Sequence, residues 1–276
     1  MPQIPKTIHY CWFGKADKPE SVCKYINTWK KYCPDYKIIE WNEDNFDITS
    51  NTYVNQAYQQ KKYAFVTDYV RLYVLYNYGG IYMDTDVEVL KPLDKFLNNS
   101  AFSGFENNNN IPTGIMGAEK GNLWIKDLLD EYNDIVFVKE NGTLDLTTNV
   151  VRITNLTKEK YGLKQESSFQ NLKNIVTLYP YDYFCPKDWE TGEIHCTENT
   201  YTIHHFSGSW HGNKEKKQAE KYRKRVKKYI SKYGEEKGKL KLNQVDLIKY
   251  YLCHPIKFIK KIISKIKGDW LWDLAL

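Results

Sequence analysis

The 276-residue sequence contains no run of about twenty apolar residues, the length that a membrane-spanning helix requires. Its six cysteines show neither a CxxC pair nor another metal-ligand spacing, and no secretory leader is recognisable before them. Internal repeats are also missing. These absences favour a cytoplasmic protein with reduced thiols over a disulfide-stabilised or membrane-spanning one.

The composition is that of a folded protein. Hydrophobic residues make up 42% of the chain and charged residues 27%, which argues against disorder. The aromatic content of 15% is high, and we expect most of these rings to lie in a core. A chain of this length is sufficient for one large α/β domain.

The charge is unevenly distributed along the chain. Residues 214–267 contain 19 Lys/Arg and 5 Asp/Glu, a balance of +14. The whole chain has 40 basic and 34 acidic residues, so the remainder has 21 and 29, a balance of −8. We therefore predict a catalytic domain over residues 1–213 and a basic helical C-terminal extension over residues 214–276.

The end of this extension has the pattern of an amphipathic helix. Isoleucines recur on one face after Pro255, lysines occupy the other face, and a Trp-rich stretch follows Gly268. This pattern is typical of a peripheral anchor on an anionic membrane surface. The alternative is a helix that packs on the protein body with solvated lysines. The acidic remainder of the chain argues against nucleic acid as a partner.

The segment 63–93 has the most specific pattern. An apolar helical period over residues 63–78 is followed by Gly79-Gly80, a short apolar run and the chain's single Asp-x-Asp pair, Asp84 and Asp86. Side chains two apart on a strand point the same way, so both carboxylates can hold one divalent cation. Such a cation neutralises the diphosphate that leaves from a nucleotide-linked donor.

The N-terminal region predicts a parallel sheet. Residues 7–13 read as a buried strand, 19–31 as a helix and 36–41 as a second strand, which together form a βαβ start. In a parallel α/β sheet, ligands bind at the carboxyl ends of the strands. We therefore expect the two aspartates to lie at such a crevice.

Asp68 and Arg71 lie one turn apart on the predicted helix that precedes the Asp pair. One interpretation is a surface ion pair worth a few tenths of a kcal/mol. The other is that both point toward the site and bind sugar hydroxyls. The spacing alone leaves both interpretations open.

Three motifs together resemble one known family. Residues 63–93, residues 4–14 and residues 203–210 are similar to segments of the DXD-containing retaining glycosyltransferases. That family includes the initiating α-1,6-mannosyltransferases of fungi, bacterial capsular polysaccharide glycosyltransferases and the glucosylating domain of large clostridial toxins. The resemblance implies a GT-A, Rossmann-like nucleotide-sugar-binding fold with a mixed, largely parallel central sheet.

The resemblance also implies roles on the donor side of the site. Trp12 would stack on the donor base, and Tyr82 would line the same pocket. Asp68 and Arg71 match the family's sugar-hydroxyl contacts. Ser209 and Trp210 fall where the family closes a loop over the diphosphate.

A metal site follows from the same resemblance. Asp86 would ligate the metal directly, and Asp84 would meet the ribose or the metal's water shell. His205 resembles the histidine that completes metal coordination in a neighbouring family, whereas His204 would face away and be structural. Because imidazole is a softer ligand than carboxylate, Mn²⁺ is favoured over Mg²⁺.

The activity implied is that of a retaining hexosyltransferase. It would move a hexose from a nucleoside-diphosphate sugar, UDP-linked by preference, to a glycan or lipid-linked saccharide in surface or capsular polysaccharide synthesis. We expect such an enzyme to be cytoplasmic and peripheral on the inner face of the cell membrane. The alternatives are a protein-modifying, toxin-like glycosyltransferase and an inactive carbohydrate-binding relative.

Overall fold

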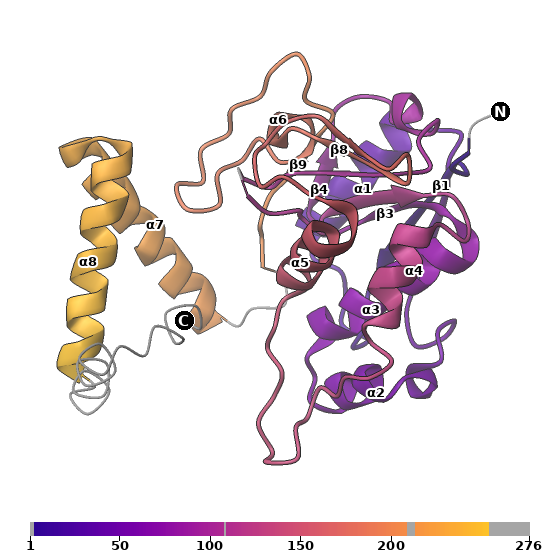
Figure 1. Cartoon of the computed structure of the whole chain (residues 1–276), viewed down its shortest axis with the longest axis horizontal. Helices are drawn as coiled ribbons and strands as arrows, with labels where there is room; N and C mark the ends of the chain where they lie inside the picture. Colours follow the sequence, from indigo (N-terminus) through magenta and orange to yellow (C-terminus); the bar gives the residue numbers. More distant parts are fainter. Residues whose placement is uncertain (1–2, 108, 209–212, 254–276) are drawn as a thin grey trace. The chain divides into compact units, whose positions relative to one another are not determined.

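The computed structural model describes residues 3–107, 109–208 and 213–253, which form two compact units (Figure 1). The first unit comprises most of the chain up to Trp210, and the second comprises helices α7 and α8 together with Glu190–Gly192. Within the described residues, no helix is both long and apolar enough to cross a membrane. The predicted boundary between residues 213 and 214 stays a prediction.

The first unit alternates strands and helices along the chain. Its helices are α1 (Glu20–Tyr32), α2 (Thr52–Gln59), α3 (Tyr63–Tyr78), α4 (Leu123–Asp130), α5 (Asn149–Tyr161) and α6 (Tyr181–Phe184), with the 3₁₀ turns η1 (Ile48–Ser50) and η2 (Asp94–Phe96). Its strands are β1 (Thr7–Cys11), β2 (Lys37–Trp41), β3 (Gly80–Met83), β4 (Val87–Val89), β5 (Ala101–Gly104), β6 (Ile115–Ala118), β7 (Gln170–Leu172), β8 (Val176–Tyr179) and β9 (Thr202–His204).

Seven of these strands form the central sheet, in the order β2-β1-β3-β6-β5-β8-β7. The pairs β1–β2, β1–β3 and β5–β8 are parallel, whereas β6 and β7 run antiparallel to their neighbours. Strands β2, β1, β3, β5 and β8 therefore point one way. The prediction of an α/β fold with a mixed, largely parallel sheet and a βαβ start is confirmed.

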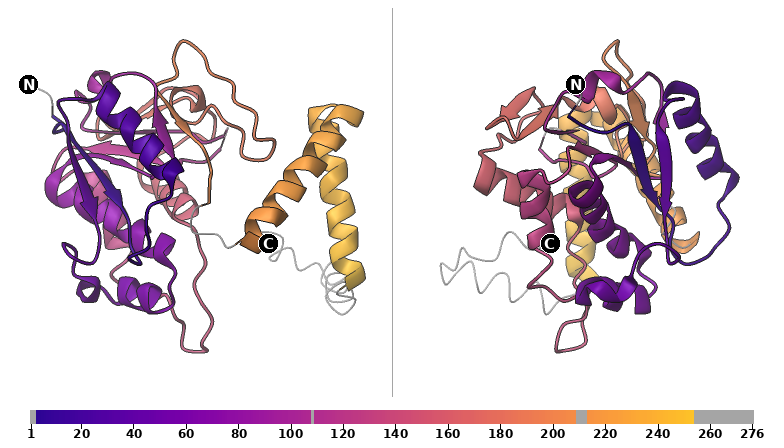
Figure 2. Two further views of the ribbon diagram at one scale, coloured as in Figure 1. Left: turned by 180° about the vertical axis from the view of Figure 1, so that it is seen from behind. Right: turned by 90° about the vertical axis from the view of Figure 1, so that its right-hand side faces the viewer.

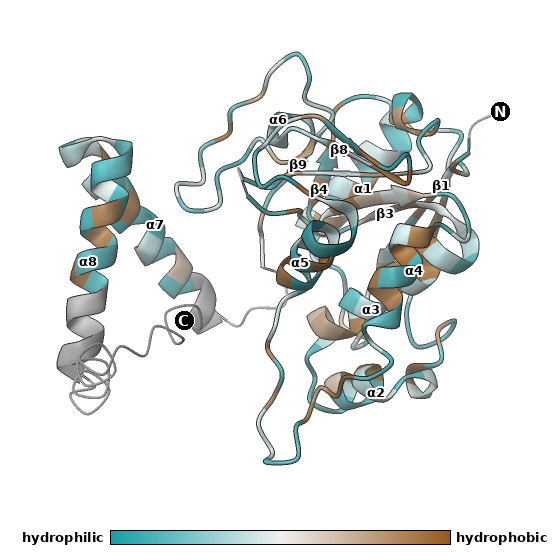
Figure 3. Cartoon of the chain, in the orientation of Figure 1, coloured by the Kyte–Doolittle hydropathy of each residue, from teal (hydrophilic) through white to brown (hydrophobic). Residues whose placement is uncertain are grey.

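Two hydrophobic clusters cover the two faces of this sheet. Tyr82 packs with residues of α2, α3, α4 and α5, while its neighbours Ile81 and Met83 pack with α1 and α6. This alternation is the two-residue period of a strand buried on both sides. The layers can be followed in Figures 1 and 2, and the apolar positions of the covering helices in Figure 3. Tyr82 therefore points toward α3, the helix that carries Asp68 and Arg71.

Two glycines fix the entry into β3. Gly79 ends α3 with φ +67°, and its N–H donates to Leu75 O. Gly80 follows with φ +113°, and a Cβ there would lie 2.7 Å from Thr7 O. Only glycine adopts such angles readily and permits this approach, so the pair sets β3 directly beside β1. This placement carries the two aspartates to the carboxyl end of the sheet.

A separate two-stranded sheet completes the site. Strand β9 pairs antiparallel with β4, with His204 opposite Val87. Trp29 of α1 anchors this ribbon, because its Nε1–H donates to Val87 O at 2.7 Å. The pairing of β9 with β4 therefore brings His204 next to the segment that follows the Asp-x-Asp pair.

The second unit is a helical hairpin of α7 (Asn213–Tyr233) and α8 (Glu235–Cys253). Gly234, with φ +80°, makes the turn between them. Val226 of α7 and Leu242 of α8 are buried at the helix contact. A Cβ on Gly238 would lie 2.7 Å from Tyr229 O, so this glycine permits the close approach of the two helices. The predicted amphipathic helix after Pro255 lies outside the described residues.

Candidate metal and donor site

The Asp-x-Asp motif occupies a tight turn between β3 and β4. The N–H of Asp84 donates to Gly114 O at 2.9 Å, and the N–H of Val87 donates to Asp84 O at 3.0 Å. The N–H of Ser207 donates to Asp86 Oδ2 at 2.7 Å. Backbone hydrogen bonds from three parts of the chain therefore hold the turn, so the carboxylates are placed before any ligand arrives.

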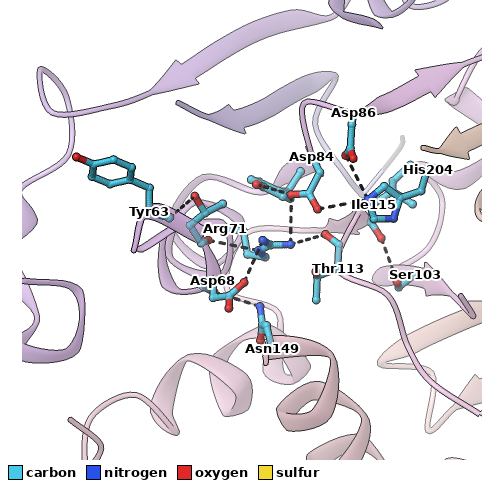
Figure 4. Close-up of polar contacts among 12 residues, drawn as sticks. Tyr63, Asp68, Arg71, Asp84, Asp86, Ser103, Thr113, Ile115, Asn149 and His204 are labelled. Atoms are coloured by element: carbon cyan, nitrogen blue, oxygen red, sulfur yellow. Dashed lines mark hydrogen bonds and ion pairs between the residues drawn. The ribbon is translucent and has the colours of Figure 1, made fainter. Parts of the chain in front are cut away.

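Asp84, Asp86 and His204 form one group of possible metal ligands. One ligand atom from each lies within 4.8 Å of the others. His204 Nε2 is 3.2 Å from Asp86 Oδ1 and 4.0 Å from Asp84 Oδ2 (Figure 4). Two carboxylates and an imidazole suit a divalent cation such as Mn²⁺. The donor set therefore fits the cation that the sequence predicts, and the cation's identity stays a prediction.

The electrostatics of this group favour a cation. Burial by itself would raise the pKa of Asp86, but the charge and hydrogen bond of His204, with the Ser207 amide, lower that pKa to about 2. Burial opposes protonation of His204, yet Asp86 raises the pKa of the imidazole well above its usual value. The surroundings of Asp86 therefore favour positive charge at this point. A divalent cation bound by the three groups would supply such a charge.

Gly114 makes room for the imidazole. A Cβ on Gly114 would lie 2.7 Å from His204 Nδ1 and 3.0 Å from its Cε1. Phe206 contacts the same ring, with the centroids 4.2 Å apart. The imidazole of His204 therefore fits because Gly114 has no side chain, and the ring of Phe206 packs against it.

Arg71 connects the helix α3 to the Asp-x-Asp motif. Its Nη2 is 3.1 Å from Asp68 Oδ1, and its Nη1 is 3.4 Å from Asp84 Oδ1 (Figure 4). Nη1 also donates to Thr113 O at 2.6 Å, and Nε donates to Thr67 O at 3.3 Å. Arg71 is only 4% exposed. This burial excludes the surface ion pair that the spacing left open.

Tyr82 lies between the same groups. Its hydroxyl donates to Asp84 Oδ1 at 2.9 Å, and the guanidinium carbon of Arg71 lies 4.8 Å from its ring centroid. Asp84 therefore uses Oδ1 for Arg71 and Tyr82, and turns Oδ2 toward His204. The arginine and the tyrosine orient one carboxylate of the candidate metal group.

Asp68 is a buried carboxyl with a raised pKa. Burial raises this pKa to about 6, although the charge of Arg71 acts in the opposite direction. Asn149, the first residue of α5, donates from Nδ2 to Asp68 O at 3.3 Å. Sequence reasoning missed Asn149, because its partner on α3 lies 81 residues away and nothing in the local sequence marks the contact.

The two histidines lie the other way round from the expectation. His205 does not join the aspartates; its Nε2 is 2.8 Å from Glu88 Oε2, and its ring stacks on Tyr25 of α1 at 4.6 Å. Neighbouring residues of an extended segment point to opposite sides, so only one histidine can face the motif. The register of β9 on β4 decides that this residue is His204.

A further carboxyl near this group was not expected. Burial raises the pKa of Glu106 to about 7, and the charge of His204 acts against that rise. Glu106 follows β5, and its N–H donates to Asn110 O at 3.0 Å. The sequence did not indicate that Glu106 would be buried, because it is followed by a run of asparagines, which is typical of a solvent-exposed loop.

Of the remaining predicted donor residues, Trp12 is among those that the structure describes. Trp12 follows β1, is half-buried, and donates from Nε1 to Ala16 O at 2.6 Å. Its stacking on a nucleotide base stays a prediction. Ser209 and Trp210 lie outside the described residues.

Comparison with known proteins agrees with the motif. Residues 19–103 match the family described as a glycosyltransferase sugar-binding region containing the DXD motif. Inositol phosphoceramide mannosyltransferase 3 of Schizosaccharomyces pombe is 32% identical over 130 residues, covering 44% of this chain and 35% of that protein. The initiation-specific α-1,6-mannosyltransferase of Candida albicans is 31% identical over 111 residues, covering 35% of this chain and 28% of that protein. The chain thus spans about a third or less of the length of these two relatives.

A solved structure titled PaToxG glycosyltransferase is 23% identical, with a TM-score of 0.42, and covers 58% of this chain and 71% of that one. The family resemblance inferred from the three motifs is confirmed by the sequence matches. Residues 19–103, which contain the Asp84-Thr85-Asp86 motif, are thus similar to the sugar-binding region of the DXD-containing glycosyltransferases.

Proposed function

We propose that this protein is a metal-dependent, retaining glycosyltransferase that moves a hexose from a nucleoside-diphosphate sugar to a saccharide acceptor. The observation that carries the proposal is the junction of two groups at one strand end. Asp84 belongs both to the Asp-Asp-His group and to the Asp68–Arg71 network. Such a junction would hold a cation and a sugar side by side.

Each of the three candidate ligands would contact the same cation. Asp86 and His204 would hold a divalent cation, with Asp84 completing the set. Bound there, the cation would neutralise the charge of the departing diphosphate. Mn²⁺ is the proposed ion, because a mixed carboxylate and imidazole set suits it better than Mg²⁺.

Arg71 would act on the donor through its neighbours. It fixes one oxygen of Asp84 and one oxygen of Asp68. The second oxygen of Asp68 would accept a hydrogen bond from a sugar hydroxyl. Because the guanidinium is buried, this fork is pre-ordered and costs no rearrangement when the donor binds.

The donor and acceptor are proposed from chemistry and from the relatives. UDP-linked hexoses are our preferred donors, and a glycan or lipid-linked saccharide is the preferred acceptor, in surface or capsular polysaccharide synthesis. The relatives named above are mannosyltransferases, and one of them is named for an inositol phosphoceramide. GDP-mannose therefore belongs in any donor panel, and a glycolipid belongs among the acceptors.

A position at a membrane would suit such an acceptor. We propose that the protein is cytoplasmic and peripheral on the inner face of the cell membrane, and that the basic C-terminal extension contacts anionic lipid. Deletion of residues 250–276 should weaken sedimentation with anionic liposomes. Unchanged sedimentation of the shortened protein would remove the anchor from this proposal.

The first test is Mn²⁺-dependent hydrolysis of UDP-glucose, UDP-galactose, their N-acetyl forms and GDP-mannose. Asp86→Asn should lose the metal-dependent signal and keep the fold. Asp130→Asn is the matched control, because Asp130 forms only an exposed pair with Lys126. One donor cleaved by the wild type and the control, with loss on chelation, would support the class of enzyme.

Two other outcomes would redirect the proposal. Binding of a donor without hydrolysis would point to a strict need for the acceptor. No binding of any nucleotide sugar would favour the inactive carbohydrate-binding alternative. A protein-modifying, toxin-like activity would be separated from polysaccharide synthesis by glycan profiling of a strain that lacks the protein.

A further inference from the structure

Helix α7 carries a line of lysines on one side. The line consists of Lys217, Lys221, Lys224 and Lys228, and we call it the α7 lysine stripe. The spacings of four, three and four residues place all four side chains on one face of a helix. From first to last the stripe rises about 16 Å along the axis, at about 1.5 Å per residue. All four residues are exposed.

The opposite side of α7 packs against α8. Val226 is buried there, and Arg225 forms an ion pair with Asp246 of α8. Tyr222 and Tyr229 are half-buried. The hairpin thus uses the apolar and aromatic side of α7 internally, and turns the stripe to solvent.

The charge of the stripe and its immediate surroundings is almost entirely positive. Glu220 is the one acidic residue between Lys217 and Lys228, and it pairs with Lys224 at 2.8 Å. Both side chains of this pair are more than half exposed, so the pair contributes little to stability. Lys227 and Lys232 lie beside the stripe and are also exposed. The stripe therefore presents a mainly positive face to solvent, which is complementary to a surface of negative charge.

The residue types distinguish between polyanions. Sites for single-stranded nucleic acid combine basic residues with exposed aromatic rings on which bases stack. The tyrosines of α7 are not on the stripe, and the stripe contains no arginine for bidentate binding of a phosphate or a base. Lysines alone, in a straight line on a rigid helix, suit a laterally fluid anionic surface, where each ammonium meets a headgroup without a fixed geometry.

We propose that the α7 lysine stripe is a docking surface for anionic phospholipid, independent of the residues beyond Cys253. Each lysine close to such a surface is worth about a fivefold gain in binding, so four are worth on the order of 100- to 1,000-fold. Because the charges are exposed, added salt weakens the contact. The proposal rests on the membrane contact proposed above for the basic C-terminal extension, but it does not depend on catalysis, so donor hydrolysis tests the enzyme activity separately.

The test uses the full chain, so that the contribution of the C-terminal residues is the same in every sample. The stripe variant replaces four lysines with glutamine, which has a similar helix propensity: Lys217→Gln, Lys221→Gln, Lys224→Gln and Lys228→Gln. The control variant removes the same charge from exposed lysines of the first unit: Lys24→Gln, Lys30→Gln, Lys31→Gln and Lys120→Gln. Circular dichroism checks that all the proteins are folded.

The measurement is co-sedimentation with vesicles of phosphatidylcholine that contain roughly one-third phosphatidylserine, at two salt concentrations. The expected result is a loss of about 100-fold or more in the partition coefficient of the stripe variant, with little change in the control. Equal losses in the two variants would overturn the proposal, because they would mean a response to net charge alone. An unchanged stripe variant would also overturn it, as would equal binding of the wild type to pure phosphatidylcholine.

A parallel measurement covers the other class of polyanion. If the stripe variant loses affinity for a single-stranded oligonucleotide but keeps its affinity for vesicles, the lipid proposal is wrong and the stripe is a nucleic-acid surface. Donor hydrolysis should be the same in wild type, stripe variant and control. A stripe variant that binds vesicles less but hydrolyses donor normally would support the lipid proposal.

Discussion

Replacement of Gly114 by alanine should impair the candidate metal site through one displaced side chain. The added Cβ would lie 2.7 Å from His204 Nδ1, whereas ordinary contact begins near 3.4 Å. The imidazole would have to retreat by about 0.7 Å, the difference between these two distances. Its Nε2 is 3.2 Å from Asp86 Oδ1, so a shift of this size changes the distance between two proposed ligands by up to about a fifth.

The expected effect is a loss of metal affinity with little loss of stability. Changes to groups that orient a metal ligand typically cost 10- to 100-fold in affinity. We therefore expect the Gly114→Ala variant to bind Mn²⁺ about 10- to 100-fold more weakly, measured by titration calorimetry or by the electron paramagnetic resonance of free Mn²⁺. Gly114 is not among the glycines with positive φ, so alanine can adopt its backbone conformation, and the midpoint temperature of thermal unfolding should stay close to the wild-type value.

A double-mutant cycle decides whether the effect passes through the imidazole. If it does, Gly114→Ala should add nothing in a His204→Ala background, because the clash has then been removed. Two outcomes would refute the reasoning: wild-type affinity in Gly114→Ala, or the full additional loss in the double mutant. The second would mean that Gly114 acts through its backbone contact with Asp84 instead.

Three further predictions concern the neighbouring groups. His204→Ala should weaken Mn²⁺ binding at least tenfold while His205→Ala does not, measured by the same titration; the reverse order would restore His205 as the ligand. Arg71→Lys should destabilise the fold by about 2–3 kcal/mol in urea unfolding, since one ammonium cannot replace a fork shared by Asp68, Asp84 and Thr113, and a wild-type midpoint would contradict this. Burial raises the pKa of Asp68 to about 6, so its contribution is present at low pH and is lost as the pH rises through about 6. Asp68→Asn cannot ionise and should therefore gain up to about 3 kcal/mol relative to wild type between pH 4 and pH 7. Parallel stability curves over that range would sink the assignment of a raised pKa.

Much of the fold could be predicted because its signals are local. The apolar period of residues 63–78, the Gly79-Gly80 pair and the following apolar run specified α3, its end and β3 within a residue or two. The βαβ start was recognisable for the same reason, because each element carries its own period. Pairing between distant strands was not local, so the antiparallel insertion of β6 beside β3 was beyond sequence reasoning.

In the candidate site, too, local features could be predicted and contacts between distant segments could not. The two aspartates are adjacent to a recognisable strand, and their shared direction follows from the strand period alone. Choice of the histidine required the register of β9 against β4, which joins segments about 120 residues apart. Asn149 and Gly114 gave no local signal, because one matters through the backbone of Asp68 and the other through the side chain that it lacks.

The amino-acid sequence alone was enough for the class of fold, the Asp-x-Asp motif, the family resemblance and the uneven charge. All of these depend on residue types at short spacings, which a chain displays whether or not it is folded. The burial of Arg71, the choice of His204 over His205 and the outward face of α7 were decided only in the folded chain. Each of these depends on which distant surface a side chain meets, and that is set by tertiary packing because the packing alone brings the two surfaces together.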